Sequence, residues 1–262
     1  APEASFRTKY LLLGPAAELA RSGEERAKTL LVAALRTDAD PHVRLRAAQV
    51  SGRVPAMQSA LIEAVDDAEV RVREAAVEAL GDPGKDAALI TPPVLMVAAL
   101  ERRLQKDPFT FVRVQAARSL GQLGATAASD DALAAALKDA APEVRARAID
   151  GLAVHRAKNH ASELRQISDR ESELAEVRSR AILALGVMCD ASRIDAWTKL
   201  ALLSMQGISD GERMLGSAAI AALGDVKPKD LAKRLAPLLD PKAPRNVREA
   251  ARAALEVQSE CK

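Results

Sequence analysis

The stretch DAEVRVREAAVEALG at residues 67–81 contains the pattern that decides the fold of this chain. Within it, Val72, Ala76 and Leu80 follow one another at intervals of four residues, which places them on one face of an α-helix. Gly81 comes next, and glycine often adopts the left-handed conformation that ends a helix. The stretch therefore predicts one amphipathic helix that ends at the glycine.

The same pattern occurs seven times along the chain, counted from an apolar anchor at position 0. The anchors are Val43, Val72, Val112, Val144, Val177, Leu215 and Val247. Alanine stands at position 4 of every copy, and leucine stands at position 8 of all copies except the first, which has Ser51. Glycine stands at position 9 in five copies, namely Gly52, Gly81, Gly121, Gly186 and Gly224. Chance enrichment in alanine does not keep these positions in register, so the chain predicts seven copies of one helix.

A second amphipathic stretch precedes each copy, as in residues 30–35 before the first and residues 133–137 before the fourth. Successive anchors are 29 to 40 residues apart. That length accommodates two helices of about 12 residues with short turns. Each repeat is therefore predicted to be an antiparallel helical hairpin.

The run at residues 67–81, echoed by Glu143 to Ala148, resembles the HEAT-repeat family, and in particular its short bacterial branch, often called PBS-lyase-like. The resemblance covers roughly Glu24 to Gln258. It implies an all-α fold, a right-handed α-solenoid of about seven HEAT-like hairpins with a degenerate N-terminal cap. We expect one domain over residues 1–262, with a capping helix in 1–23, repeats in 24–258 and a tail in 259–262. In the cap, Phe6-Arg7 stands where Val-Arg would begin a copy.

An arginine follows most anchors, and the HEAT resemblance implies a structural role for it. In that family the arginine commonly bonds an Asp at the preceding turn, and Asp67, Asp107, Asp139 and Asp210 stand five residues before their anchors. Gly216 replaces the arginine in the sixth copy, which predicts a gap there and leaves Asp210 without its partner. The segments Gly81 to Pro93 and Asp169 to Glu173 are expected to be loops, either solvated linkers or parts of a binding edge.

The same resemblance implies that the second helix of each hairpin lines the concave face, at positions 2, 3 and 6. Arg118, Arg147 and Arg180 fall there on successive repeats, about 10 Å apart if the helices pack at their usual separation. The candidate partner-binding residues are Arg46, Arg118, Arg147, Arg180 and Leu183. An extended acidic segment of another protein would suit this face. The alternative is that these charges only keep the surface soluble.

Composition limits the other kinds of partner. The net charge is +2, so no strong field attracts nucleic acid or anionic lipid. The longest apolar runs, such as residues 94–100, are much shorter than the roughly 20 residues of a membrane span. Aromatic residues make up 2% of the chain, so alanine, leucine, valine and isoleucine must fill the core. The sequence therefore predicts neither nucleic-acid binding nor a membrane span.

No catalytic residue, metal site or cofactor is predicted. Deoxyhypusine hydroxylases resemble this fold and hold two irons with His-Glu pairs, but His42, His155 and His160 are not followed by Glu. HEAT-like DNA glycosylases need more aromatic residues than are present. Bilin lyases share the repeat signature itself. We therefore expect a non-catalytic protein-protein interaction module or scaffold, with a bilin-lyase-like or other HEAT-fold enzyme as the alternative and a nucleic-acid-binding protein as the second.

The two cysteines and the chain ends suggest further expectations. Cys189 and Cys261 should lie about 20 Å apart, two repeats of helix spacing, and should be free thiols unless the tail folds back. If the start at Ala1 reflects a cleaved signal peptide, the protein is periplasmic or secreted, and otherwise cytoplasmic. An open apolar edge at the N-terminal cap would allow a weak homodimer; without it, the protein is a monomer.

Overall fold

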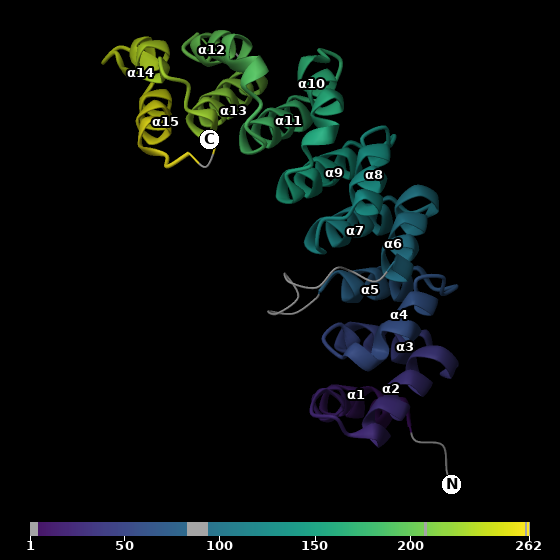
Figure 1. Ribbon diagram of the computed structural model, residues 1–262. Coiled ribbons are helices and arrows are strands. Elements are labelled where there is room, and N and C mark those ends of the chain that lie inside the picture. Colours follow the sequence, from purple (N-terminus) through teal and green to yellow (C-terminus); the bar gives the residue numbers. More distant parts are fainter. Residues whose placement is uncertain (1–4, 83–93, 207–208, 260, 262) are drawn as a thin grey trace. The chain divides into compact units, whose positions relative to one another are not determined.

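The computed structural model describes residues 5–82, 94–206, 209–259 and 261 of the chain. These residues form fifteen α-helices joined by turns and short 3-10 helices, with no strand among them (Figure 1). The helices group into two compact units, Ala1–Ala136 and Leu137–Lys262. The predicted all-α architecture is confirmed, and the single domain over residues 1–262 stays a prediction.

The first unit contains three complete hairpins after a leading helix. Its helices are α1 (Phe6–Arg21), α2 (Glu25–Thr37), α3 (Pro41–Ser51), α4 (Gln58–Ala64), α5 (Val70–Gly81), α6 (Val94–Lys106), α7 (Thr110–Gln122) and α8 (Ala127–Ala136). Helices α2, α4 and α6 each pair with the next helix along the chain. The second helices of the hairpins, here called B helices, pack on one another in the order α1, α3, α5, α7.

The second unit repeats this arrangement. Its helices are α9 (Pro142–His155), α10 (Ala161–Asp169), α11 (Ala175–Val187), α12 (Ile194–Leu203), α13 (Asp210–Val226), α14 (Leu231–Leu235) and α15 (Arg245–Glu256). The B helices α9, α11, α13 and α15 pack in that order. Each of the seven predicted copies therefore corresponds to one B helix, from α3 to α15.

The core follows the sequence register. All seven alanines at position 4, from Ala47 to Ala251, have 0% exposed surface, and the seven anchors are buried as well. Alanine at this position allows neighbouring helix backbones to approach, because a larger side chain would hold them apart. The core is thus built from small and branched side chains, as the composition predicts.

The glycines at position 9 have a different role from the one predicted. Among the described residues, the only glycine with a positive φ is Gly23, and Gly81, Gly186 and Gly224 lie within their helices. A Cβ atom on Gly186 would lie 2.8 Å from the Cα of Ala222, and one on Gly224 would lie 2.9 Å from the Cα of Ala254. These glycines therefore bring their B helices against position 7 of the next, as do Gly52 and Gly81. The left-handed caps at Arg156 and Lys227 are not glycines.

The arginines after the anchors do pair with carboxylates, but each pair connects neighbouring repeats. This series of ion pairs is called the arginine ladder here. Arg44 donates to the Asp67 carboxylate at 2.8 and 2.9 Å, and Arg73 donates to Asp107 at 2.9 and 3.3 Å. In each pair the carboxylate precedes the following B helix, whereas the sequence predicted one before the arginine's own helix. At its own preceding turn, each arginine instead donates to backbone carbonyls, as Arg44 does to Asp38 at 3.0 Å.

Each ladder carboxylate also fixes the start of the next B helix. Asp67 and Asp107 accept the backbone N–H two residues ahead, at 2.8 and 3.0 Å. Burial opposes ionisation of Asp107, but hydrogen bonds from Arg73 and the Phe109 N–H outweigh it and hold the pKa of Asp107 below its usual value. The ladder thus links two repeats and one helix N-terminus through a single carboxylate.

In the second unit, Glu173 serves as a ladder carboxylate. Arg145 donates to it at 2.8 and 2.6 Å. Glu173 belongs to the charged run that was expected to be a solvated loop or binding edge, yet its residue is only 8% exposed. It stands four residues before Val177, and its longer side chain reaches the place an aspartate occupies elsewhere. The other predicted loop, Gly81 to Pro93, lies mostly outside the described residues.

The ladder step from α11 to α13 has no cross-repeat ion pair among the described residues, whereas the gap predicted at Gly216 concerns the next step, from α13 to α15. Arg178 donates to the Ser168 carbonyl at 3.1 Å, and Asp210 pairs with Arg213 on its own helix. Asp210 therefore has a partner, contrary to expectation, but a local one. At Gly216 a side chain would overlap Ser204 at the end of α12, so close approach explains the missing arginine.

The cysteines are not free thiols. Cys189 and Cys261 form a disulfide with a Cα–Cα distance of 5.4 Å. After α15 the tail turns back, with Lys227 donating to the Val257 carbonyl at 2.7 Å and Ser259 donating to the Asp225 carbonyl. Five extended residues reach about 17 Å, enough to cross the end of α13 and meet the end of α11. The expected separation of about 20 Å was wrong because helix spacing alone does not include this return of the tail.

The leading helix α1 lies where a B helix would, but in another register. Phe6 is 49% exposed and is not a buried anchor. The cation that faces the next repeat is Lys9, which pairs with Asp38 at 2.9 Å. Leu11 and Leu19 are also exposed on α1, at 61% and 52%. The homodimer through such an edge stays a prediction.

The ladder predicts how stability depends on pH. Because folding lowers the pKa of Asp107, its contribution is complete above the unfolded value of about 3.9 and is lost as the pH falls through the lower folded value. Replacing it, as in Asp107→Asn, leaves Arg73 unpaired and should cost about 3 kcal/mol or more at pH 7. The variant should also lose less stability than the wild type below pH ~4. Urea unfolding from pH 3 to pH 7 measures both effects.

Asp210→Asn is the matched control, because the Asp210 side chain is 94% exposed and its only described ion pair is local. Its unfolding free energy should change by less than about 1 kcal/mol. Equal losses in the two variants would contradict the structural role of the ladder.

The disulfide should stabilise the second unit. It closes a loop with a sequence separation of 72, for which loss of unfolded-chain entropy corresponds to about 4 kcal/mol. Urea unfolding with and without a thiol reductant should show a lower midpoint after reduction. The double variant Cys189→Ser/Cys261→Ser should match the reduced wild type and should not respond to the reductant. An unchanged midpoint in the reduced protein would show that the disulfide does not stabilise the second unit.

Candidate functional site

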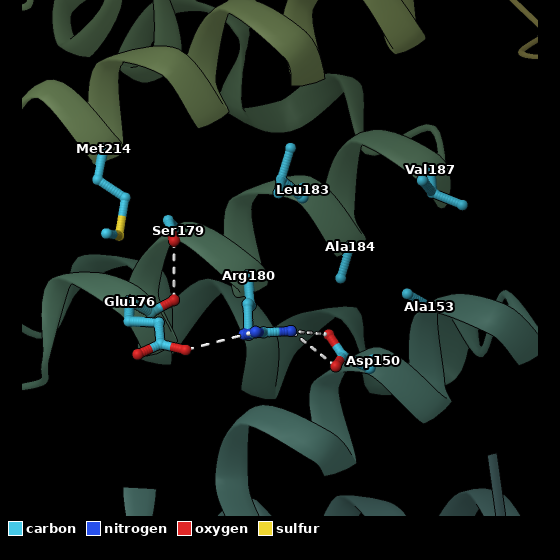
Figure 2. Close-up of a pocket in the computed structure, with 9 residues that line it drawn as sticks. All are labelled: Asp150, Ala153, Glu176, Ser179, Arg180, Leu183, Ala184, Val187 and Met214. Atoms are coloured by element: carbon cyan, nitrogen blue, oxygen red, sulfur yellow. Dashed lines mark hydrogen bonds and ion pairs between the residues drawn. The ribbon is translucent and has the colours of Figure 1, made fainter. Parts of the chain in front are cut away.

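A pocket of about 490 Å³ opens on the B-helix face of the second unit. It is called the α11 pocket here, because most of its lining residues belong to that helix (Figure 2). The lining residues are Asp150, Ala153, Glu176, Ser179, Arg180, Leu183, Ala184, Val187 and Met214. They come from the three successive B helices α9, α11 and α13, so the packing of these helices forms the pocket.

One side of the pocket is apolar and accessible. Leu183, Val187 and Met214 are 38%, 37% and 43% exposed. Leu183 points from α11 toward α13, and Met214 points from α13 toward α11 (Figure 2). Both helices place their anchors and alanines in the core, which leaves these side chains on the opposite face. The pocket therefore presents large apolar groups to solvent.

The other side contains an ion-pair cluster. Arg180 Nη1 donates to the two Asp150 oxygens at 2.8 and 2.7 Å, and Nη2 donates to Glu176 at 3.3 Å (Figure 2). Burial disfavours the charged guanidinium, but the hydrogen bonds that Arg180 donates to Asp150 and Glu176 outweigh this and raise the pKa of Arg180. Arg180 is thus held in place as a cation.

Arg147 joins the same cluster. It is exposed and pairs with Asp150 at 3.3 Å, so one carboxylate serves two arginines. With Glu176 included, two formal positive charges meet two negative ones. The cluster has no net charge, and the attraction for an acidic segment that the arginines alone would exert is cancelled here.

The other two candidate arginines lie in the first unit. Arg118 is exposed on α7. Arg46 is half-buried on α3, with its guanidinium 5.5 Å from the centre of the Tyr10 ring. The structure therefore brings together Arg147, Arg180 and Leu183 of the predicted set. Arg46 and Arg118 lie on α3 and α7 of the first unit.

Sequence reasoning missed two apolar residues of the pocket. Met214 stands immediately before its anchor, where most copies have a polar or charged residue such as Arg71 or Glu143. Val187 stands at position 10, after the glycine. Comparing the copies position by position would have revealed Met214 as an apolar residue on an exposed face. Val187 gives no such signal, because position 10 varies between copies.

Among the described residues, no three His, Cys, Asp or Glu side chains are grouped so that they could hold a metal ion. Within the same residues, no helix is both long and apolar enough to cross a membrane.

Stacked helical hairpins joined by small-residue contacts define an α-helical repeat protein. The chain contains HEAT repeats: the family model for HEAT repeats matches residues 29–121 and 59–153. The matched residues include the B helices from α3 to most of α9, and the same hairpin pattern continues through α15. No protein of curated function matches the chain in sequence.

Solved structures with a similar fold are distant in sequence. The CpcE–CpcF complex of phycocyanin lyase from Nostoc sp. PCC7120 is 21% identical, with a TM-score of 0.51, 87% of this chain covered and 86% of the other. A structure of Kap95p bound to RanGDP is 16% identical, with a TM-score of 0.57, 97% of this chain and 37% of the other. An engineered protein is 19% identical, with a TM-score of 0.51, 93% of this chain and 72% of the other. At these identities the likeness shows the fold alone.

Proposed function

We propose that this protein is a non-catalytic protein-protein interaction module that binds a partner through the α11 pocket. The observation that carries the proposal is the trio Leu183, Val187 and Met214, large apolar side chains left more than one third exposed around one hollow. Exposed apolar groups gathered at a hollow are typical of binding sites, whereas isolated ones are not.

The size and chemistry of the pocket indicate what it accepts. A volume of about 490 Å³ accommodates one or two apolar side chains of a partner segment, such as leucine, methionine or phenylalanine. Met214 can adjust to different shapes because its side chain is unbranched. The paired charges of Arg180, Asp150 and Glu176 then form a polar rim. The partner is accordingly a protein segment with an apolar anchor and a polar flank.

This proposal changes the partner expected from sequence. The candidate residues Arg147, Arg180 and Leu183 remain part of the binding face, but the apolar side chain contributes most and the arginines orient the partner. Arg46 and Arg118 remain candidates for contacts in the first unit. Phycocyanin lyase shares the fold, and that likeness gives no separate support to lyase activity in this chain.

The disulfide supports a proposal about the compartment. A bond between Cys189 and Cys261 persists in oxidising surroundings, such as the periplasm or the extracellular space, and is rare where glutathione keeps thiols reduced. We therefore propose that the protein works outside the cytosol. The test is to alkylate free thiols in intact cells before lysis and then to count the alkylated cysteines of this protein. If the disulfide is present in the cell, Cys189 and Cys261 are both left unalkylated.

The test of the pocket is the substitution Leu183→Glu in the full chain. A carboxylate at the apolar wall should abolish burial of the partner's anchor and weaken capture at least tenfold, as for a central interface residue. The wild type and the variant are immobilised, and the proteins that each one retains from native extract are quantified by mass spectrometry. Thermal unfolding confirms that the variant is folded.

Leu202→Glu provides the matched control. Leu202 is 36% exposed, close to the 38% of Leu183, but it lies on α12 away from the pocket. This variant should retain the wild-type set of proteins. If Leu183→Glu retains the same proteins in the same amounts, the pocket is not the binding site.

A further inference from the structure

The few aromatic residues of this chain are distributed unevenly. Trp197 is buried with 1% exposure, but the remaining three phenylalanines and one tyrosine all lie in the first unit. Phe6 and Tyr10 are on the first turns of α1, and Phe109 and Phe111 are at the start of α7. All four are therefore near the N-terminal ends of B helices, and those ends share one edge of the stack because the B helices are parallel.

The two B helices between α1 and α7, which are α3 and α5, complete a row. His42 on α3, Arg71 on α5 and Phe111 on α7 all stand immediately before their anchors, and Phe6 is the first residue of α1. Phe6 meets the His42 ring edge-on at 6.3 Å between centroids, and the Arg71 guanidinium lies 5.2 Å from the centre of the Phe111 ring. We call Phe6, Tyr10, His42, Arg71, Phe109 and Phe111 the aromatic edge.

Folding does not account for this row. Phe6, Phe109 and Phe111 are 49%, 45% and 36% exposed, whereas the anchors beside them are buried. At the position before the anchor, the second unit has Glu143, Glu176 and Asn246 as well as Met214, so the repeat itself does not require a ring there. Aromatic side chains exposed on one edge are typical of binding surfaces.

The polar side chains of the aromatic edge, His42 and Arg71, are hydrogen-bond donors, and each has a carboxylate beside it. The His42 side chain is 72% exposed and the Arg71 side chain 64%. His42 already pairs with Asp40 at 3.1 Å, and Arg71 already pairs with Glu74 at 2.8 Å. The edge thus combines ring surfaces with N–H donors that nearby carboxylates balance. It suits an uncharged ligand rich in hydrogen-bond acceptors.

A polyproline II segment has this chemistry. Its carbonyl groups form no internal hydrogen bonds and remain free to accept, and its proline rings pack on aromatic side chains. One turn of three residues rises about 9.3 Å, and neighbouring helices lie about 8–10 Å apart. One turn of such a ligand therefore advances by about one repeat along the stack in Figure 1.

We propose that the aromatic edge binds a proline-rich polypeptide in the polyproline II conformation, which runs from α1 toward α7. Its proline rings pack against Phe6 and Phe111, and its carbonyl groups accept hydrogen bonds from Arg71 and His42. This surface lies in the first unit, whereas the α11 pocket belongs to the second. The protein then has two binding surfaces with different ligand chemistry.

The experiment uses the full chain and a fluorescein-labelled, uncharged peptide of about 12 residues built from Pro-Pro-Gln repeats, long enough for about four repeats. Fluorescence anisotropy should show saturable binding. Phe111→Ala should weaken it about tenfold or more, as for a central aromatic contact. Phe6→Ala is a second variant, and the Phe6 ring also lies outside the core. If one of the two variants fails to fold, the other still tests the proposed binding. Leu183→Glu should leave this affinity unchanged, since it alters only the pocket.

Two further peptides identify the occupant. A peptide with every proline replaced by alanine, and an acidic proline-free peptide of equal length, should each bind at least tenfold more weakly. The proposal is overturned by no saturable binding of the proline-rich peptide, by equal binding of either control peptide, or by unchanged affinity in both alanine variants. A negative result with the peptide would not affect the Leu183→Glu test of the α11 pocket. A negative result in that test would not affect the peptide experiment.

Discussion

The contact on which the structure depends is the one between consecutive B helices, where a glycine or a small residue of one helix meets a small residue of the next. At Gly186 and Ala222 the backbones are so close that even one added methyl group has no room. This spacing favours alanine and branched aliphatic side chains, which make up most of the core.

The sequence was sufficient for the repeat register, because the anchors and the alanines at position 4 are set by burial alone, and all of them are buried. The role of the position 9 glycines could not be read in the same way, since a glycine near a helix end fits both a left-handed cap and a close approach to a neighbour. Glu173 was missed because its longer side chain replaces an aspartate one position away. The disulfide was missed because its two residues meet only through the return of the tail, which no helix spacing describes.

The candidate site, too, was predictable from the sequence only in part. Leu183 and Arg180 were predicted from their positions on the B helix, and both line the pocket. The sequence also contained Asp150, but its pairing with two arginines depends on the distance between α9 and α11, which a one-dimensional pattern does not supply. Once that pairing is known, the apolar wall of Leu183, Val187 and Met214 becomes the more informative part of the site.

The free energy of unfolding of Gly186→Ala tests the small-residue contact most directly, because two physical effects predict opposite signs. Helix propensity alone would stabilise the variant by up to about 1 kcal/mol. The account predicts a loss of about 1–3 kcal/mol instead, because the new Cβ would lie 2.8 Å from the Cα of Ala222 and would push α13 away from α11. A variant as stable as the wild type, or more stable, would contradict the claim that contact between the B-helix backbones holds this protein together.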